Sequence, residues 1–183
     1  EVKLALELPL QKVKLNAVLL KNINSHQLDD YLGLLKNDKL SLRFIELMQT
    51  GDNLEYFNQF HISADKLKNQ LIDKGWQTCI KDPIAGPAIE FSHSDFKGKL
   101  GIIAPYSKDF CDSCNRLRVS AEGKFHLCLF GEQGFSVRHL LQQESQITEL
   151  KTALKDLLKE KKPSHFLQQG NTGDRLHLAS IGG

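Results

Sequence analysis

Residues 12–48 read KVKLNAVLLKNINSHQLDDYLGLLKNDKLSLRFIELM, and this stretch predicts the fold class. Residues 12–20 alternate between polar and apolar side chains and then become fully apolar, which is typical of a strand. Ser25 is expected to cap a helix that runs to about Lys36, because apolar residues recur three and four apart, at Leu28, Tyr31, Leu32 and Leu35. Residues 41–48 predict a second strand. Strand, helix and strand in this order indicate parallel pairing in an α/β fold.

The alternation of strand and helix continues after this stretch. Ser63 is expected to cap a helix over residues 64–74, with Leu67, Leu71 and Ile72 buried and Gly75 just past its end. Two strand–helix units can neither close a barrel nor complete a doubly wound sheet. We therefore expect the first half of the sheet to be missing from this chain.

From residue 76 onward the pattern changes to short strands separated by Gly and Pro. The predicted strands are 76–80, 88–93, 99–104, 117–120 and 124–130, and their spacing suggests antiparallel pairing. Glu122-Gly123 is a candidate hairpin turn. An amphipathic helix is expected over residues 146–160, and the segment from Pro163 onward is expected to be a loosely ordered tail.

The composition narrows the class of protein. A formal charge of +2 over 183 residues is too small to indicate a nucleic-acid partner. No run is long and apolar enough for a membrane span, and no signal peptide is evident, so we expect a cytoplasmic protein without a membrane partner. The chain begins at Glu1 and its one methionine is Met48, which favours a fragment or a processed product. Four cysteines in such a chain indicate metal or redox chemistry.

The main chemical signal is the pair Cys111 and Cys114, followed by Cys128 after thirteen intervening residues. Two thiolates on a tight turn reach one metal site, and the third can fold back from a hairpin strand. An iron–sulfur cluster with three protein ligands would keep one iron open. His126 could instead complete a Cys3His zinc site, and a dithiol or buried thiols are further alternatives. We interpret Cys79 as structural.

Basic residues provide a second signal. Arg116 and Arg118 lie two apart on a predicted strand, so they point the same way and could clamp a triphosphate, while Leu117 and Val119 face the opposite, packed side. Two solvated arginines are the alternative.

Lys14 and Arg43 occupy the polar register of predicted parallel strands, where an anion would offset their burial, although either could lie at a surface strand end. Met48 ends its strand where such sheets bind ligands, or it fills the core.

Taken together, these segments resemble the molybdenum cofactor biosynthesis protein A family, the radical S-adenosylmethionine GTP 3′,8-cyclases. The resemblance covers essentially all 183 residues. It rests on Lys14 in VKLNAV, Arg43 in LRFIELM, residues 110–130 and the ending Ile181-Gly182-Gly183.

The resemblance implies roles for individual residues. Cys111, Cys114 and Cys128 would hold a [4Fe–4S] cluster whose open iron meets the guanine of GTP. Residues implied to bind GTP are Lys14, Arg116, Leu117 and Arg118, with Arg43 as a further phosphate contact. Met48 would contact S-adenosylmethionine. Gly182 and Gly183 would form a flexible tail that reaches the active site.

The resemblance also implies a fold: the C-terminal part of an incomplete (β/α) TIM-type barrel over residues 1–80, then a small α+β cluster-binding domain over residues 81–183. In such an enzyme a second [4Fe–4S] cluster cleaves S-adenosylmethionine, and the resulting radical takes hydrogen from C3′ of GTP before C3′ joins C8. The Cys-x-x-x-Cys-x-aromatic-Cys motif for that cluster has no match here. We therefore expect this chain alone to be inactive.

The resemblance implies partners as well: a homodimer, and a downstream cyclic pyranopterin monophosphate synthase that uses the product. One alternative is a zinc-stabilised binding module. Another is a radical S-adenosylmethionine protein with an auxiliary cluster and a different substrate.

Overall fold

The computed structural model describes residues 2–82, 85–112, 114–131 and 134–173, in two units. One unit comprises residues 1–48 and 55–110, and the other comprises residues 49–54 and 111–183. Both contain helices and strands, so the chain is mixed α/β with open sheets.

The first unit begins with a short helix, α1 (Val2–Glu7), and then forms the predicted strand–helix–strand unit. β1 (Val13–Leu19) and β2 (Leu40–Glu46) pair in parallel, with Val13 beside Leu40 and Leu19 beside Glu46. Between them α2 (Leu28–Leu35) buries Leu28, Leu32 and Leu35. The predicted stripe is therefore correct, although Tyr31 is only half-buried and meets Phe44 edge-on at 5.0 Å between ring centroids.

The start of α2 differs from the prediction. Gln27, not Ser25, precedes the first helical residue, and no side chain caps this end. The reason lies in Asn24, whose Oδ1 accepts from the Leu20 N–H and whose Nδ2 donates to the Val18 carbonyl, both at 2.8 Å. These bonds hold residues 20–26 as a turn against the end of β1. Ser25 Oγ accepts from the Asn22 N–H within this turn.

The connection after β2 contains one helix that was not predicted and one that was. α3 (Leu54–Phe60) is unpredicted, whereas α4 (Ala64–Asp73) begins where expected, because Ser63 Oγ accepts from the Asp65 N–H at 3.2 Å. Gly75 follows α4 with φ +85°, a left-handed conformation that favours glycine. Ile72 is 50% exposed, so its predicted burial is wrong; it lies beside Leu71 in sequence but on the outer side of the helix.

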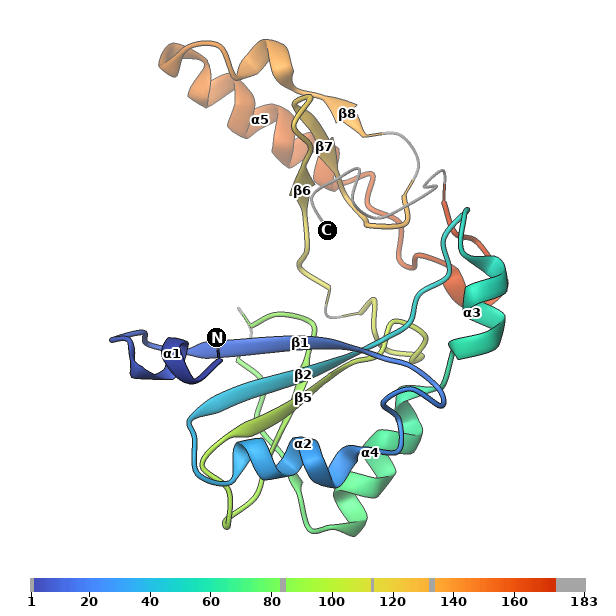
Figure 1. Ribbon diagram of the computed structural model, residues 1–183. Coiled ribbons are helices and arrows are strands. Elements are labelled where there is room, and N and C mark those ends of the chain that lie inside the picture. Colours follow the sequence, from blue (N-terminus) through green and yellow to red (C-terminus); the bar gives the residue numbers. More distant parts are fainter. Residues whose placement is uncertain (1, 83–84, 113, 132–133, 174–183) are drawn as a thin grey trace. The chain divides into compact units, whose positions relative to one another are not determined.

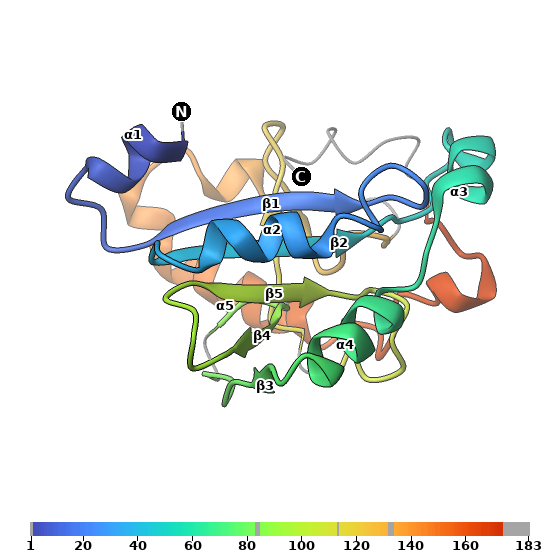
Figure 2. The ribbon, with the colours of Figure 1, turned by 60° about the horizontal axis from the view of Figure 1, so that its bottom comes forward.

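Three further strands complete the sheet of the first unit: β3 (Gln77–Thr78), β4 (Ile89–Ser92) and β5 (Lys99–Ile103). The strand order is β1-β2-β5-β4-β3 (Figure 2). β3 with β4 and β4 with β5 are antiparallel, as predicted. β5 pairs in parallel with β2 on its other side, so this unit continues past residue 80.

The two faces of this sheet differ in chemistry. Helices α2 and α4 cover one face (Figure 1), and the largest side chains buried there are Phe44, Phe91, Leu35, Leu71 and Leu100. Each such side chain stabilises the fold by about 1.5–3 kcal/mol. The other face of β1 and β2 carries polar residues in alternate positions: Lys14 and Asn16 on β1, and Ser41 and Arg43 on β2.

The second unit contains a small antiparallel sheet and one longer helix. Its strands are β6 (Arg118–Val119), β7 (Lys124–His126) and β8 (Phe135–Ser136), in the order β6-β7-β8. The predicted hairpin turn at Glu122-Gly123 joins β6 to β7, and Gly123 has φ +73°. α5 (Ile147–Leu158) forms within the predicted helix, after the short 3-10 turns Arg138–Leu140 and Glu144–Gln146.

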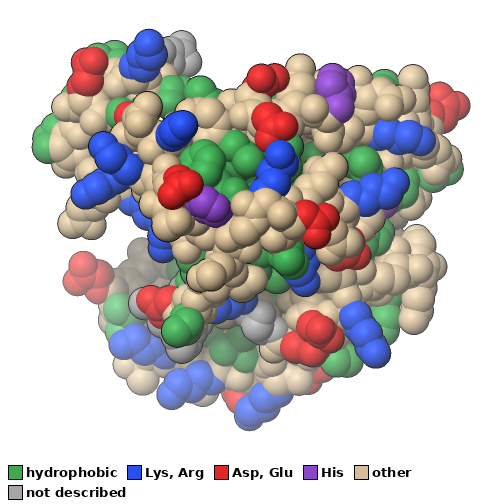
Figure 3. Space-filling view, turned by 90° about the horizontal axis from the view of Figure 1, so that it is seen from below, with side chains coloured by type: hydrophobic (Ala, Val, Ile, Leu, Met, Phe, Trp, Pro, Cys, Tyr) green, Lys and Arg blue, Asp and Glu red, His purple; other side chains and the backbone are tan. Residues whose placement is uncertain are grey.

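The surface carries both signs of charge. On the face shown in Figure 3, Lys and Arg side chains are interspersed with Asp and Glu. Within the described residues, no helix has the length and apolar character needed to cross a membrane.

Candidate functional site

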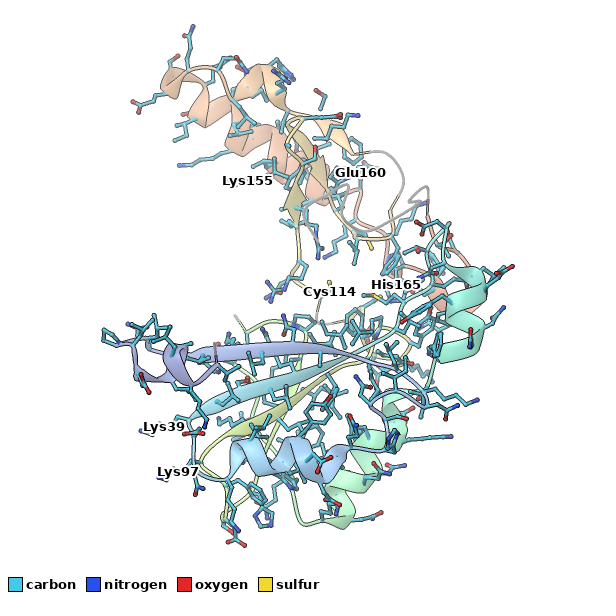
Figure 4. The ribbon with its side chains drawn as sticks, in the orientation of Figure 1. Lys39, Lys97, Cys114, Lys155, Glu160 and His165 are labelled. Atoms are coloured by element: carbon cyan, nitrogen blue, oxygen red, sulfur yellow. The ribbon has the colours of Figure 1, made fainter. Side chains whose placement is uncertain are left out.

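Three free cysteines lie in the second unit, on two segments. Cys111 and Cys114 share a turn in which the Cys114 N–H donates to the Cys111 carbonyl at 3.1 Å. Cys128 lies just after β7, where its carbonyl accepts from the Gly131 N–H at 3.4 Å. All three are half-buried and form no disulfide (Figure 4 labels Cys114). Each of these residues is thus partly covered by protein and partly accessible to solvent.

Several groups change the pKa of the Cys128 thiol. Burial raises the pKa of the Cys128 thiol, and negative charge on Cys114 and Cys111 raises that pKa further. The backbone N–H of Phe130 and the ammonium of Lys161 act in the opposite direction and lower the pKa. The Cys111 and Cys114 thiols thus belong to the electrostatic surroundings of Cys128.

The three thiols do not meet at one point. Among the described ranges, no group of three or more His, Cys, Asp or Glu side chains is arranged to hold a single metal ion. Zinc needs its ligands at ~2.3 Å from one centre, whereas thiolates can ligate separate irons of a cluster. The donor set, three thiols in one unit, is of the kind that ligates an iron–sulfur cluster.

Arg116 and Arg118 follow this turn. Arg118 opens β6 opposite His126 of β7, and Arg116 is exposed two residues earlier. The expectation that Leu117 and Val119 pack on the opposite side is wrong, because they are 40% and 57% exposed. β6 is only two residues long and lies at the end of its sheet, so it offers little surface to pack against.

Lys14 and Arg43 belong to the polar face of the first unit. Lys14 is exposed on β1 beside Ser41, and Arg43 lies on β2 between Asn16 and Gly101. A side chain at Gly101 would meet Arg43 Cγ at 2.7 Å, so the glycine leaves room for the arginine stem. The Arg43 Nε is buried without a hydrogen bond, which leaves one donor of its guanidinium available to an anion.

The remaining predicted residues lie elsewhere. Met48 is half-buried just past the carboxyl end of β2. Cys79 belongs to the first unit, where its thiol donates to Ser92 Oγ at 3.4 Å. Gly182 and Gly183 lie outside the described residues.

Comparison with known proteins decides the family. Residues 40–167 match the family model described as Molybdenum Cofactor Synthesis C. The chain belongs to this family. The matched range runs from β2 to the 3-10 turn Leu167–Gln169, so it includes the three-cysteine region.

Two relatives extend the match of this Molybdenum Cofactor Synthesis C member to the whole chain. A GTP 3′,8-cyclase from Vibrio parahaemolyticus is 50% identical over 182 residues, and one from Shewanella denitrificans is 52% identical over the same length. In both cases the match covers 100% of this chain and 54% of the relative. The chain therefore spans about half the length of these proteins.

Sequence patterns did not point to two features of the second unit. Lys161 Nζ donates to the Cys114 carbonyl at 2.6 Å, across 47 residues of sequence. Cys128 and the buried imidazoles of His126 and His165 line a cavity of about 260 Å³ (Figure 4 labels His165). A lysine just beyond a helix carries no distinctive spacing, so only the folded chain reveals its contact.

A third feature belongs to the first unit. Glu46, the last residue of β2, is buried, and its Oε1 lies 2.9 Å from His61 Nε2. His61 in turn stacks on Phe57 at 4.5 Å and meets Tyr106 at 5.2 Å between ring centroids. Burial raises the pKa of the Glu46 carboxyl, although His61 and the Ala64 N–H lower it in part. The pair ties the end of β2 to the segment between α3 and α4.

Proposed function

We propose that this chain is the C-terminal part of a GTP 3′,8-cyclase of molybdenum cofactor biosynthesis, and that it carries a GTP-side [4Fe–4S] site. The observation that supports this most directly is the grouping of Cys111, Cys114 and Cys128 in one unit of a chain that is 50% identical to a protein of that name. The family match over residues 40–167 is consistent with it.

The fold assignment is part of the proposal. We assign β1, α2, β2 and β5 to the C-terminal part of an incomplete (β/α) TIM-type barrel. Parallel pairing of β1, β2 and β5, with helices on one face, supports this. In barrels of this type, ligands bind at the carboxyl ends of the strands.

The three thiolates would hold the cluster and leave one iron without a protein ligand. When bound, the cluster would supply an open iron that coordinates the purine of GTP. Arg116 and Arg118 would bind phosphate, for which guanidinium groups beside the turn are suited; Arg116 is exposed and Arg118 half-buried. Leu117, which lies between the two arginines in the sequence, would contact the nucleotide, and its side chain is 40% exposed and so accessible to a ligand.

Residues of the first unit complete the proposed assignments. Lys14 and Arg43 would neutralise phosphate charge, supported by their place on the polar face and by the buried Arg43 Nε. Met48 would contact S-adenosylmethionine, because it follows the carboxyl end of a parallel strand, where ligands of α/β sheets bind. Gly182 and Gly183 would reach into the active site.

The complete reaction would need more than this chain. We assign S-adenosylmethionine cleavage to a second [4Fe–4S] cluster held by the part of the protein that the relatives have and this chain does not match. The full-length protein would act as a homodimeric lyase. This chain would position GTP and leave radical formation to the other half.

Anaerobic reconstitution with iron and sulfide tests the cluster. We expect close to four irons and four sulfides per chain, by analogy with a [4Fe–4S] cluster, and loss of both in Cys128→Ser. Cys79→Ser serves as the matched control, since that thiol bonds only to Ser92 among the contacts described above. GTP should alter the electron paramagnetic resonance spectrum of the reduced cluster.

The rival functions give different results in the same experiment. A native preparation that contains zinc and no iron would favour a Cys3His binding module, for which the burial of His126 beside Cys128 is the relevant observation. A loaded cluster whose spectrum ignores GTP and responds to another substrate would point to a different radical enzyme.

A further inference from the structure

Lys161 makes a contact that joins two distant parts of the second unit. It lies just beyond α5, where its N–H donates to the Leu158 carbonyl at 3.2 Å and continues the last turn of the helix. Its side chain is half-buried and reaches the turn that carries two of the cysteines, donating to the Cys114 carbonyl at 2.6 Å. An ammonium–carbonyl bond this short is a charge-assisted hydrogen bond.

The same side chain places a positive charge beside the thiols. The ammonium of Lys161 lies at the backbone of Cys114, so its charge is held beside one of the three cysteines. The neighbouring Lys159 differs, because its Nζ pairs with Asp156 on the surface at 2.7 Å and its side chain is 75% exposed. Lys161 therefore differs from Lys159 in the position of its ammonium group, since both carry the same charge.

Three thiolates and a cluster of this type carry net negative charge, and reduction adds one more. A fixed cation nearby favours the reduced form, so it raises the reduction potential. A bond to the Cys114 carbonyl also holds the turn in place before any metal binds. Residues that orient metal ligands in this way are worth about 10- to 100-fold in metal affinity.

We propose that Lys161 is a positioning residue of the three-cysteine site, which fixes the Cys111–Cys114 turn through the Cys114 carbonyl and holds a positive charge beside the cluster. The inference rests on the proposed cluster. It adds a link between the end of α5 and the cysteine turn, because a residue that follows the helix holds the turn in place through a hydrogen bond.

The test compares four forms of the 183-residue chain: wild type, Lys161→Gln, Lys161→Arg and the matched control Lys159→Gln. Thermal unfolding of each metal-free form checks that the unit is folded. After anaerobic reconstitution, the measurements are cluster loss to a chelator and the midpoint potential from a mediated redox titration. Neither measurement depends on catalytic activity.

We expect Lys161→Gln to lose its cluster about 10- to 100-fold more readily than wild type and to have a more negative midpoint potential. Lys161→Arg should restore most of the potential because it keeps the charge, and Lys159→Gln should match wild type. A Lys161→Gln potential equal to that of Lys159→Gln would overturn the inference. If Lys161→Gln does not fold, Lys161→Arg is the deciding variant. Because Lys161→Arg keeps the positive charge, a midpoint potential clearly more negative than that of wild type would overturn the inference.

The outcome for wild type separates this inference from the proposed function. If wild type takes up no iron and sulfide, or fills with zinc, the proposed cluster site fails and the role of Lys161 fails with it. If wild type binds the cluster and all four forms behave alike, the cluster site stands and the role of Lys161 alone is wrong.

Discussion

At the scale of single residues, burial changes the surroundings of two charged side chains, Glu46 and Arg43. Glu46 is 2% exposed at the end of β2, so its carboxylate depends on His61 and the Ala64 N–H in place of water. Arg43 is held over Gly101 with its Nε buried. Arg116, in contrast, is exposed and owes its proposed role to position alone.

Glu46 should make stability depend on pH. Its pKa in the folded chain is raised above the ordinary 4.5, so the folded state binds the proton more readily than the unfolded state does. The stability that this supplies is fully present below the unfolded pKa and is lost as the pH rises through the folded pKa. Wild type should therefore lose stability relative to Glu46→Gln as the pH rises from 4.5 toward neutrality.

Urea unfolding of both proteins across this pH range measures the difference. Glu55→Gln is the matched control, because Glu55 is an exposed carboxylate on α3. A difference between wild type and Glu46→Gln that stays constant with pH would show that Glu46 titrates alike in the folded and unfolded chains.

Arg116→Ala should weaken GTP binding much more than it weakens folding. A charge-assisted phosphate contact is worth roughly 1.5–3 kcal/mol, or about 10- to 150-fold in affinity. An exposed arginine contributes little to stability, so the melting temperature should stay close to that of wild type. Isothermal titration with GTP, in the longer protein to which we assign this chain, measures the first effect.

Lys155→Ala is the control for this variant, because it removes an exposed positive charge on α5 of the same unit. A large drop in melting temperature with unchanged GTP affinity would make Arg116 a structural residue.

At the scale of elements, capping separates two serines that look alike in the sequence. Ser63 caps α4 by accepting from the Asp65 N–H at 3.2 Å. Ser25 was predicted to do the same for α2, yet Asn24 holds the preceding turn and the helix starts at Leu28. A helix end is thus set by which side chain reaches the free backbone N–H groups, and a neighbouring turn can displace it.

Ser63→Ala should lower the free energy of unfolding by about 1 kcal/mol, because an N–H at the start of α4 loses its acceptor. Ser25→Ala should cost less, since Ser25 accepts only an exposed 3.3 Å bond from Asn22. Chemical unfolding monitored by circular dichroism measures both. Equal losses in the two variants would contradict the cap at Ser63.

At the scale of the whole molecule, β1 lies at an edge of its sheet. Among the described residues it stands at one end of the order β1-β2-β5-β4-β3 and pairs with β2 alone, and its Val18 is 43% exposed. Open edges and exposed apolar side chains favour pairing with another chain. Under our proposal this edge would adjoin the rest of the barrel in the longer protein.

The reconstituted chain alone should neither cleave S-adenosylmethionine nor cyclise GTP. With Cys111, Cys114 and Cys128 assigned to one cluster, Cys79 is the one cysteine left, and one thiolate cannot hold a second cluster. Anaerobic incubation with S-adenosylmethionine, GTP and dithionite, followed by chromatography for 5′-deoxyadenosine, measures this. Catalytic turnover would show that the radical centre lies in this chain.

The sequence by itself determined the elements whose signals are local. The alternation in β1, the leucine stripe of α2, the cap at Ser63 and the turn at Gly123 each depend on residues within a few positions of one another. The family could also be identified from its motifs. The ligand roles of the three cysteines, and the GTP roles of the arginines, stay predictions drawn from that resemblance.

Only the tertiary structure decided how distant segments combine. The parallel pairing of β5 with β2 joins residues about sixty positions apart, and the Lys161–Cys114 bond spans 47. The exposure of Ile72, Leu117 and Val119, and the burial of Glu46, follow from which surfaces neighbouring elements cover. Periodicity shows which side chains share a face. Whether that face is buried depends on another element packing against it, because apolar side chains stabilise the fold only when contact removes them from water.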